Sequence, residues 1–106
     1  MVPLVRDLLC ELRRGLVSLY GNRLSDLVLF GSQARGDAEA GSDIDVLVVL
    51  NGPVQPGAEI DRVSPMTAAL SLEYSVVISC AFVSAERYAG ERSPLLMNIR
   101  REGVPV

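Results

Sequence analysis

Residues 31–49 read GSQARGDAEAGSDIDVLVV, and no other stretch of the chain says as much about its fold. Gly31 and Ser32 follow directly on the apolar run 27–30, which predicts a strand that ends in a tight turn. A glycine at such a strand end lets the backbone turn sharply and approach a ligand. Ser32 can then present its hydroxyl and backbone N–H to a phosphate, helped by the positive end of a short helix that we expect to follow.

Two aspartates, Asp43 and Asp45, stand at the start of the next apolar run, 46–50. Alternate residues of a strand point to the same face, so both carboxylates project together. Two like charges this close repel each other unless a cation lies between them. Oxygen ligands favour Mg²⁺ or Mn²⁺ over Zn²⁺, and such an ion can bridge the phosphates of a nucleotide. Without the neighbouring Gly-Ser turn, the same pair would be an ordinary exposed turn-and-cap feature.

Arg35 lies in the same turn, and two roles for it stay open. Its guanidinium group suits the oxygens of a triphosphate, and it suits equally an ion pair with Asp37 or with one of the two paired aspartates. Gly36 predicts a left-handed position at the end of the turn. The candidate nucleotide-binding residues are therefore Gly31, Ser32 and Arg35.

The composition excludes several kinds of chemistry. All ten basic residues among the 106 are arginine, and the chain has no histidine. A Schiff-base lysine, a P-loop lysine, a histidine general base and a His-ligated zinc site are therefore absent. The net charge of −3 gives no global electrostatic signal for nucleic-acid binding. Carboxylates, arginine, hydroxyls and backbone groups remain, and metal-assisted phosphoryl chemistry fits that set.

The length predicts a single domain over residues 1–106. We expect a cytoplasmic protein without membrane contact, because no signal peptide is visible and no apolar run approaches the roughly 20 residues that span a bilayer. Cys10 and Cys80 lie in apolar segments, which predicts two buried thiols without a disulfide. Hydrophobic residues make up 49% of this small chain, which suggests that some apolar surface meets a partner.

Hydrophobic periodicity predicts a small α/β domain, a mixed sheet with flanking helices around one core. Leucines at i, i+4 spacing predict the first helix, and the continuous apolar run 44–50 predicts a strand buried on both faces in the sheet centre. Pro65 should break or restart the helix around it. The expected elements are helix 4–19, strand 24–30, a short helix within 31–36, strand 44–50, helix 58–74, strand 75–83, helix 84–88 and helix 94–101.

The pattern GSQARG…SDIDVLVV resembles the minimal nucleotidyltransferases of the DNA polymerase beta superfamily, and the order of helices and strands extends the resemblance over most of the chain. The resemblance implies a polymerase beta palm-like fold and transfer of a nucleotidyl group from a Mg-NTP, with ATP as substrate, to a hydroxyl. By resemblance, Ser32 belongs to the nucleotide-binding turn, and Asp43 and Asp45 are the catalytic metal ligands. Many such proteins are antitoxins of a helical HEPN-type toxin, and some transfer AMP to a tyrosine of that partner.

One departure from the family pattern leaves the function open. The superfamily commonly supplies a third carboxylate from the next core strand, but residues 75–83 contain no Asp or Glu. Glu73, just before that strand, is the nearest candidate for the role. Two functions follow: an antitoxin-type enzyme that uses Mg-ATP and modifies or masks a partner protein, or a degenerate binding module that neutralises its partner by contact. In either case we expect the chain to act in a complex, with a helical partner or as a homodimer. A nucleotidyltransferase for a small molecule is a third possibility, although 106 residues leave little room for a substrate domain.

Overall fold

A computed structural model of the protein describes residues 3–38 and 42–106, so residues 39–41 of the stretch quoted above lie outside the described part. Helices separate the successive strands along the chain. The elements are α1 (Pro3–Tyr20), η1 (Gly21–Arg23), β1 (Leu24–Phe30), α2 (Ser32–Arg35), β2 (Ile44–Leu50), α3 (Pro56–Tyr74), β3 (Ile78–Ser84), α4 (Ala85–Gly90), α5 (Pro94–Glu102) and β4 (Val104–Pro105). None of the described helices is long and apolar enough to cross a membrane.

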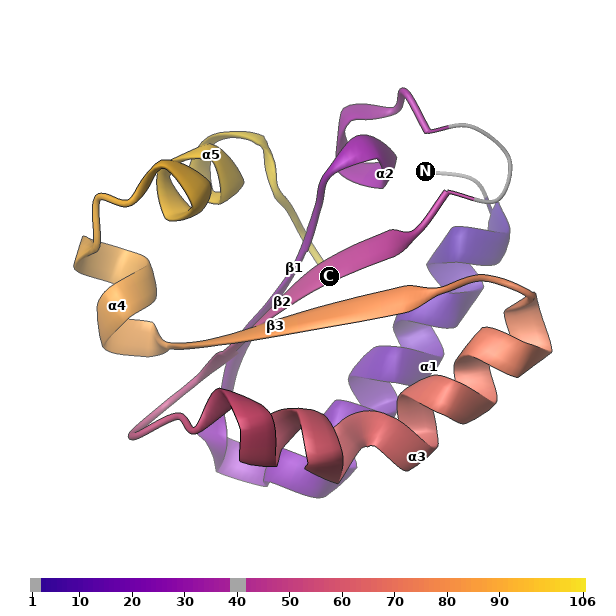
Figure 1. Ribbon diagram of the computed structural model, residues 1–106, viewed down its shortest axis with the longest axis horizontal. Coiled ribbons are helices and arrows are strands. Elements are labelled where there is room, and N and C mark those ends of the chain that lie inside the picture. Colours follow the sequence, from indigo (N-terminus) through magenta and orange to yellow (C-terminus); the bar gives the residue numbers. More distant parts are fainter. Residues whose placement is uncertain (1–2, 39–41) are drawn as a thin grey trace.

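The strands form one mixed sheet in the order β3-β2-β1-β4. β1 runs antiparallel to both β2 and β4, whereas β2 runs parallel to β3. β2 therefore has a neighbour on each side, and all its residues except Asp45 are buried, as the continuous apolar run predicts. Figure 1 shows α1 and α3 on one face of the sheet and α4 and α5 on the other. The expected α/β fold with a mixed sheet and flanking helices is confirmed.

The sheet separates two hydrophobic clusters, where the sequence predicted one core. Alternate residues of β2 point to opposite faces, so the strand contributes to both clusters. Ile44, Val46 and Val48 pack with α1 and α3. Leu47 and Val49 pack on the other side with residues of α5. Asp45 has the same parity as Leu47, so its side chain lies on the α5 side of the sheet.

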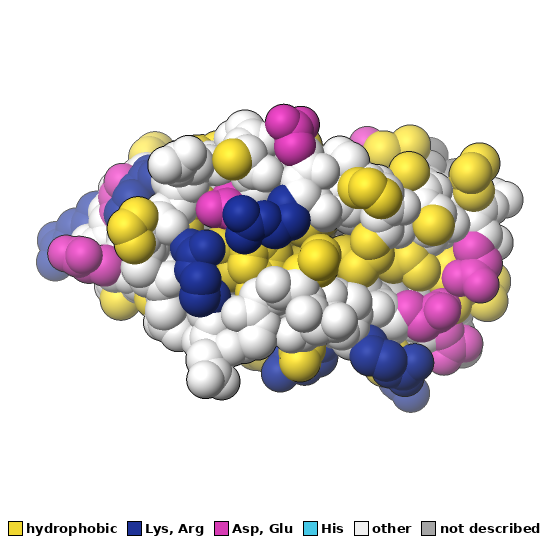
Figure 2. Space-filling model, turned by 90° about the horizontal axis from the view of Figure 1, so that it is seen from below, with side chains coloured by type: hydrophobic (Ala, Val, Ile, Leu, Met, Phe, Trp, Pro, Cys, Tyr) yellow, Lys and Arg dark blue, Asp and Glu magenta, His cyan; other side chains and the backbone are white. Residues whose placement is uncertain are grey.

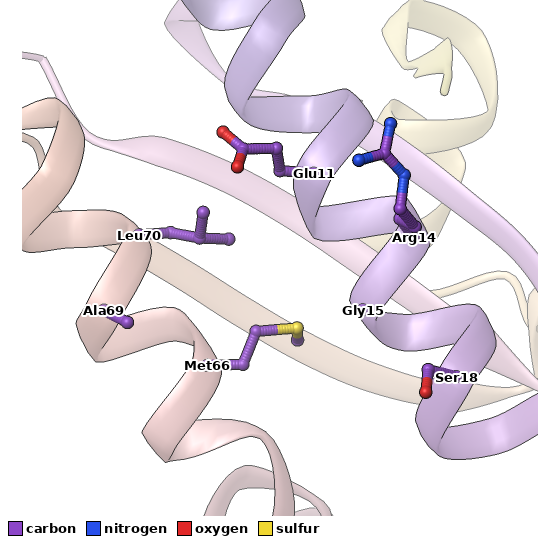
Figure 3. Close-up of a pocket in the computed structure, with 7 residues that line it drawn as sticks. All are labelled: Glu11, Arg14, Gly15, Ser18, Met66, Ala69 and Leu70. Carbon is purple, nitrogen blue, oxygen red and sulfur yellow. The ribbon is translucent and has the colours of Figure 1, made fainter.

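Helix α1 buries the face that the leucine spacing predicts, which includes Leu8, Leu12 and Leu16, but Leu4 at its beginning is exposed. The helix crosses α3 closely at Gly15. A Cβ atom on Gly15 would lie only 1.9 Å from the sulfur of Met66, so a larger residue here would require the flexible Met66 side chain to move. Figure 3 shows Met66 reaching from α3 toward Gly15.

Helix α3 continues through Pro65, and the predicted break at this residue is wrong. Proline removes one helical hydrogen bond and crowds the preceding turn. Pro65 is exposed, while Val63 and Leu70 on either side of it are buried in the cluster shared with α1. Packing of these flanking turns holds the helix together, because tertiary contacts supply most helical stability.

Two further predictions, the burial of the cysteines and the start of the third strand, need correction. Cys10 is exposed, because it lies on the outer side of α1, and Cys80 is only partly buried. The third strand begins at Ile78, later than the predicted residue 75, because Ser75 has φ +53° and ends α3 in a left-handed conformation. The two-residue strand β4 was not predicted, since so short a run carries no periodicity.

Replacing Tyr20 with phenylalanine is expected to lower the free energy of unfolding by about 1–3 kcal/mol. The Tyr20 hydroxyl donates a 2.9 Å hydrogen bond to the carboxylate of Glu59, a residue that is only 4% exposed. Loss of the hydroxyl leaves a buried carboxylate with one partner fewer. Urea unfolding checks this, with Tyr88→Phe on the opposite face of the sheet as the matched control. Equal stability of the Tyr20 variant and the native chain would contradict a structural role for this bond.

Candidate functional site

The carboxylate of Asp45 packs against Gly31 where β1 ends. Asp45 is the second residue of β2 and pairs with Phe30, the last residue of β1. Gly31 has φ +74° and ψ −157°, a conformation that is essentially restricted to glycine. A Cβ atom at Gly31 would lie 2.7 Å from Oδ2 of Asp45, a distance that real Cβ atoms do not reach. The missing side chain thus makes room for the carboxylate, and the turn and the Asp-x-Asp pair predicted from the sequence meet at this point.

Asp43 and Asp45 act on each other electrostatically. Asp43 is exposed and precedes β2, whereas Asp45 is partly buried. Burial, followed by the negative charge of Asp43, raises the pKa of Asp45. The pair therefore has a repulsion that a bound cation would relieve.

The carboxylates of Asp43 and Asp45 are the candidate ligands for a metal ion. Residues 3–38 and 42–106 contain no group of three or more His, Cys, Asp or Glu side chains arranged to hold a metal. Two carboxylates are nevertheless the usual protein contribution to a Mg²⁺ ion, which keeps several waters and binds substrate phosphates. The arrangement of Asp43 and Asp45 fits that mode of binding, and it does not fit a closed structural metal site.

The four-residue helix α2 begins at Ser32, directly after the glycine. The backbone N–H groups of Ala34 and Arg35 both donate to the carbonyl of Gly31 at 3.1 Å, which fixes the turn. Gly36 ends it with φ +80° in the left-handed region, as predicted. Ser32 therefore lies next to the glycine that contacts Asp45.

Arg35 pairs with Asp37 in this structure, which is one of the two roles left open by the sequence. Its Nε atom lies 3.2 Å from Oδ2 of Asp37, and the two side chains are 47% and 61% exposed. Exposed ion pairs contribute little to stability. A phosphate group can therefore replace Asp37 as the partner of this guanidinium at small cost.

Ser79 occupies the position beside Asp45 on the neighbouring strand. The parallel register of β2 and β3 pairs Asp45 with Ser79, and paired residues of adjacent strands share a face of the sheet. Ser79 is exposed, so this strand presents a hydroxyl beside Asp45 and not a carboxylate.

Glu73, the acid suggested from the sequence, lies elsewhere. It is an exposed residue near the end of α3, which packs on the opposite face of the sheet from Asp45. The hydrogen bond that the Tyr74 hydroxyl donates to Glu11 is the largest cause that raises the pKa of Tyr74, and burial is the next. The negative charge of Glu73 is a smaller cause of the same shift. The structure therefore does not bring Glu73 together with the paired aspartates.

A hollow of about 160 Å³ adjoins the turn and was not foreseen from the sequence. Phe30, Gly31 and Arg35 form one wall, and Leu95, Asn98 and Glu102 of α5 form the other. In Figure 1, α5 and α2 lie on opposite sides of the end of β1. The residues of α5 carried no motif, and only the packing of α5 on the sheet brings them to the site.

Two other hollows are not lined by Asp43 or Asp45. One of about 490 Å³ is lined by Pro53, Phe82 and Arg87 at the other end of β2 and β3. The second, of about 380 Å³, lies between α1 and α3 and is lined by Glu11, Arg14, Gly15, Ser18, Met66 and Leu70 among others (Figure 3). Figure 2 shows this helical face, where hydrophobic side chains run along the surface with arginine side chains among them.

Comparisons with known proteins find a matching family and several similar proteins. A family model described as a nucleotidyltransferase domain matches residues 9–95. Two proteins of Methanocaldococcus jannaschii, each named "putative protein adenylyltransferase", are similar to this chain. One is 40% identical over 78 residues, which cover 74% of this chain and 72% of the relative. The other is 29% identical over 73 residues, which cover 69% and 73%.

A solved structure also has this fold. The crystal structure of a protein titled "putative nucleotidyltransferase" from Sulfolobus solfataricus superposes with a TM-score of 0.58. The match covers 96% of this chain and 80% of that one, at 22% sequence identity. At this identity the likeness concerns the fold alone.

Proposed function

Because the chain belongs to the nucleotidyltransferase domain family, we propose that it transfers AMP from Mg-ATP to a hydroxyl of a partner protein. The observation that carries the proposal is the contact geometry of Gly31 and Asp45, with Ser32 next in the turn and Asp43 on the same strand end. Both similar proteins carry the name "putative protein adenylyltransferase", and this name supports AMP and a protein acceptor.

Each residue then has a role in the reaction. Asp43 and Asp45 would hold a divalent ion, which when bound neutralises charge on the phosphates and on the leaving pyrophosphate. Ser32 orients a phosphate at the turn, and Arg35 exchanges Asp37 for phosphate oxygens. The acceptor oxygen forms a bond to the α-phosphorus while the bond from that phosphorus to the bridging oxygen breaks. Pyrophosphate leaves, and the acceptor proton passes to water.

The proposal extends to the partner. We take the acceptor to be a helical HEPN-type toxin, for which this chain is the antitoxin. The exposed apolar side chains on α1 and α3 support a protein partner, since large apolar side chains left uncovered can be buried by a second chain. They include Val17, Leu19, Ile60 and Leu72, of which Leu72 is 84% exposed. A homodimer over the same face is the alternative for this surface.

Labelled ATP tests the function directly. The native chain is incubated with Mg²⁺, α-labelled ATP and the product of the neighbouring gene, and the proteins are separated. Label on the partner that depends on Mg²⁺ supports the proposal, and γ-labelled ATP serves as the control that must leave no label. Nucleotide binding without transfer would favour a second function, a degenerate module that neutralises its partner by contact.

The second function has a specific observation in its favour, namely the hydroxyl of Ser79 beside Asp45. We expect Ser79→Asp to raise the rate of transfer, because it places a third acid on the same sheet face, where a general base typically contributes about 10²–10⁴-fold. Ser79 is exposed, so the substitution should leave folding intact. Glu73→Gln is the matched comparison and should leave transfer unchanged, since Glu73 lies on the helix covering the opposite face. Loss of transfer in Glu73→Gln would contradict this assignment of the site.

A further inference from the structure

Helix α5 turns one side toward the Gly31 turn. Leu95, Asn98 and Glu102 follow one another at intervals of three and four residues, which places them on one side of the helix. Asn98 and Glu102 carry amide and carboxylate groups, and both residues are exposed. Leu95 is 56% exposed, so an apolar side chain stands uncovered at the edge of the same hollow.

The hollow and the paired aspartates share a residue. Gly31 lines the hollow, and the position of its missing Cβ lies against Oδ2 of Asp45. Phe30, also in the wall, is paired with Asp45 across the sheet. A ligand whose phosphates meet Ser32 and the aspartates can therefore extend along the Gly31 turn into this space without crossing the sheet.

The volume of the hollow limits which part of a nucleotide can enter it. Its volume of about 160 Å³ is roughly half the lower end of the range for sites that enclose a drug-sized molecule. It suits a single ring system and excludes a whole nucleotide. Phe30 and Leu95 offer apolar surface to a flat ring, while polar groups of Asn98 and Glu102 stand at its edge.

We propose that this hollow binds the adenine ring of the nucleotide and that Asn98 and Glu102 determine the specificity for adenine. The proposal rests on the nucleotidyl transfer proposed above. Oδ1 of Asn98 accepts a 2.8 Å hydrogen bond from Arg101, so we assign its amide nitrogen as the group that donates to a ring nitrogen of the base. The carboxylate of Glu102, whose ion pair with Arg101 is long at 3.8 Å, accepts from the exocyclic amino group. Guanine carries a carbonyl oxygen in place of that amino group, so it meets a repulsive contact.

Calorimetry with Mg-ATP, Mg-GTP and Mg-tripolyphosphate tests the proposal on the intact chain. The native protein should bind ATP more tightly than GTP. Asn98→Ala should weaken ATP binding by about 5- to 150-fold, the usual discrimination of a good base contact, and should leave tripolyphosphate binding unchanged. Glu102→Gln should bring the ATP and GTP affinities together, because glutamine can donate to the guanine carbonyl. Met97→Ala, at a 50% exposed residue of α5 outside the hollow, is the control and should bind like the native chain.

The outcomes separate this inference from the function on which it rests. If the native chain binds ATP and GTP equally while it binds tripolyphosphate and transfers label, the base site is wrong and the transferase function stands. The same holds if Asn98→Ala and Glu102→Gln both keep the native ATP-to-GTP ratio. If the native chain binds neither nucleotide nor tripolyphosphate, both proposals are overturned. Circular dichroism establishes that each variant keeps its helices, and the two independent substitutions allow a decision if one of them does not fold.

Discussion

Asp45→Asn is expected to reduce transfer of label from ATP by about 10³-fold, because a bound metal ion supplies several kcal/mol of transition-state stabilisation and each 1.4 kcal/mol is about tenfold in rate. The double variant Asp43→Asn/Asp45→Asn should lose Mg²⁺-dependent ATP binding altogether. Folding should change little, since burial and the charge of Asp43 already raise the pKa of Asp45 and thus disfavour its ionised form. An asparagine removes that repulsion along with the ligand.

Activity and calorimetry together check this result. Asp61→Asn makes the same chemical change at an exposed position of α3, on the opposite side of the sheet, and should retain native affinity and rate. Unchanged Mg-ATP affinity in the double variant would remove the two aspartates from the site. A parallel loss of stability in urea would instead indicate that they act mainly in folding.

Gly31→Ala is expected to lower transfer by about 10²-fold, the effect that a displacement of about 1 Å has on a reacting group, and to destabilise the fold by about 1–3 kcal/mol. The added methyl group would occupy a position 2.7 Å from the Asp45 carboxylate and would force either the side chain or the turn to move. It would also hold alanine at φ +74° and ψ −157°, where a side chain is strained.

Gly36→Ala separates the effect of the contact with Asp45 from the effect of the strained backbone. Gly36 has a similar φ of +80°, but a Cβ atom there meets nothing within 4 Å. This variant should lose about 1–2 kcal/mol of stability through the left-handed backbone alone, with the rate of transfer unchanged. Equal rates for Gly31→Ala and Gly36→Ala would show that the contact with Asp45 has no part in the chemistry.

The strands around the site were predictable from local pattern. Strands 24–30 and 44–50 contain the continuous apolar runs 27–30 and 46–50 and are bounded by turn residues, and the structure forms them at those residues. The spacing of Asp43 and Asp45 follows from the two-residue period of a strand, which needs no tertiary information.

Other features depended on contacts between distant residues. The pairing of Ser79 with Asp45 is a matter of register between β2 and β3, which the sequence of neither strand determines alone. The approach of α5 to the Gly31 turn joins residues more than sixty positions apart, and none of them carries a motif. Glu73 appeared close because it directly precedes a strand in the sequence, whereas the helix that carries it covers the other face. Pro65 was misjudged because local propensity yields to the packing of the turns on either side.

The alternation along β2 has a consequence for how an active molecule can arise. Ile44, Val46 and Val48 fill one cluster, while Asp45 and Leu47 point to the other side. A slip of one residue in the pairing would turn every side chain of the strand to the opposite face. Asp45 would then be forced among leucines, and the cluster beneath α1 would lose its central valines. The register that buries Ile44 beneath α1 is therefore the same register that sets the Asp45 carboxylate against Gly31.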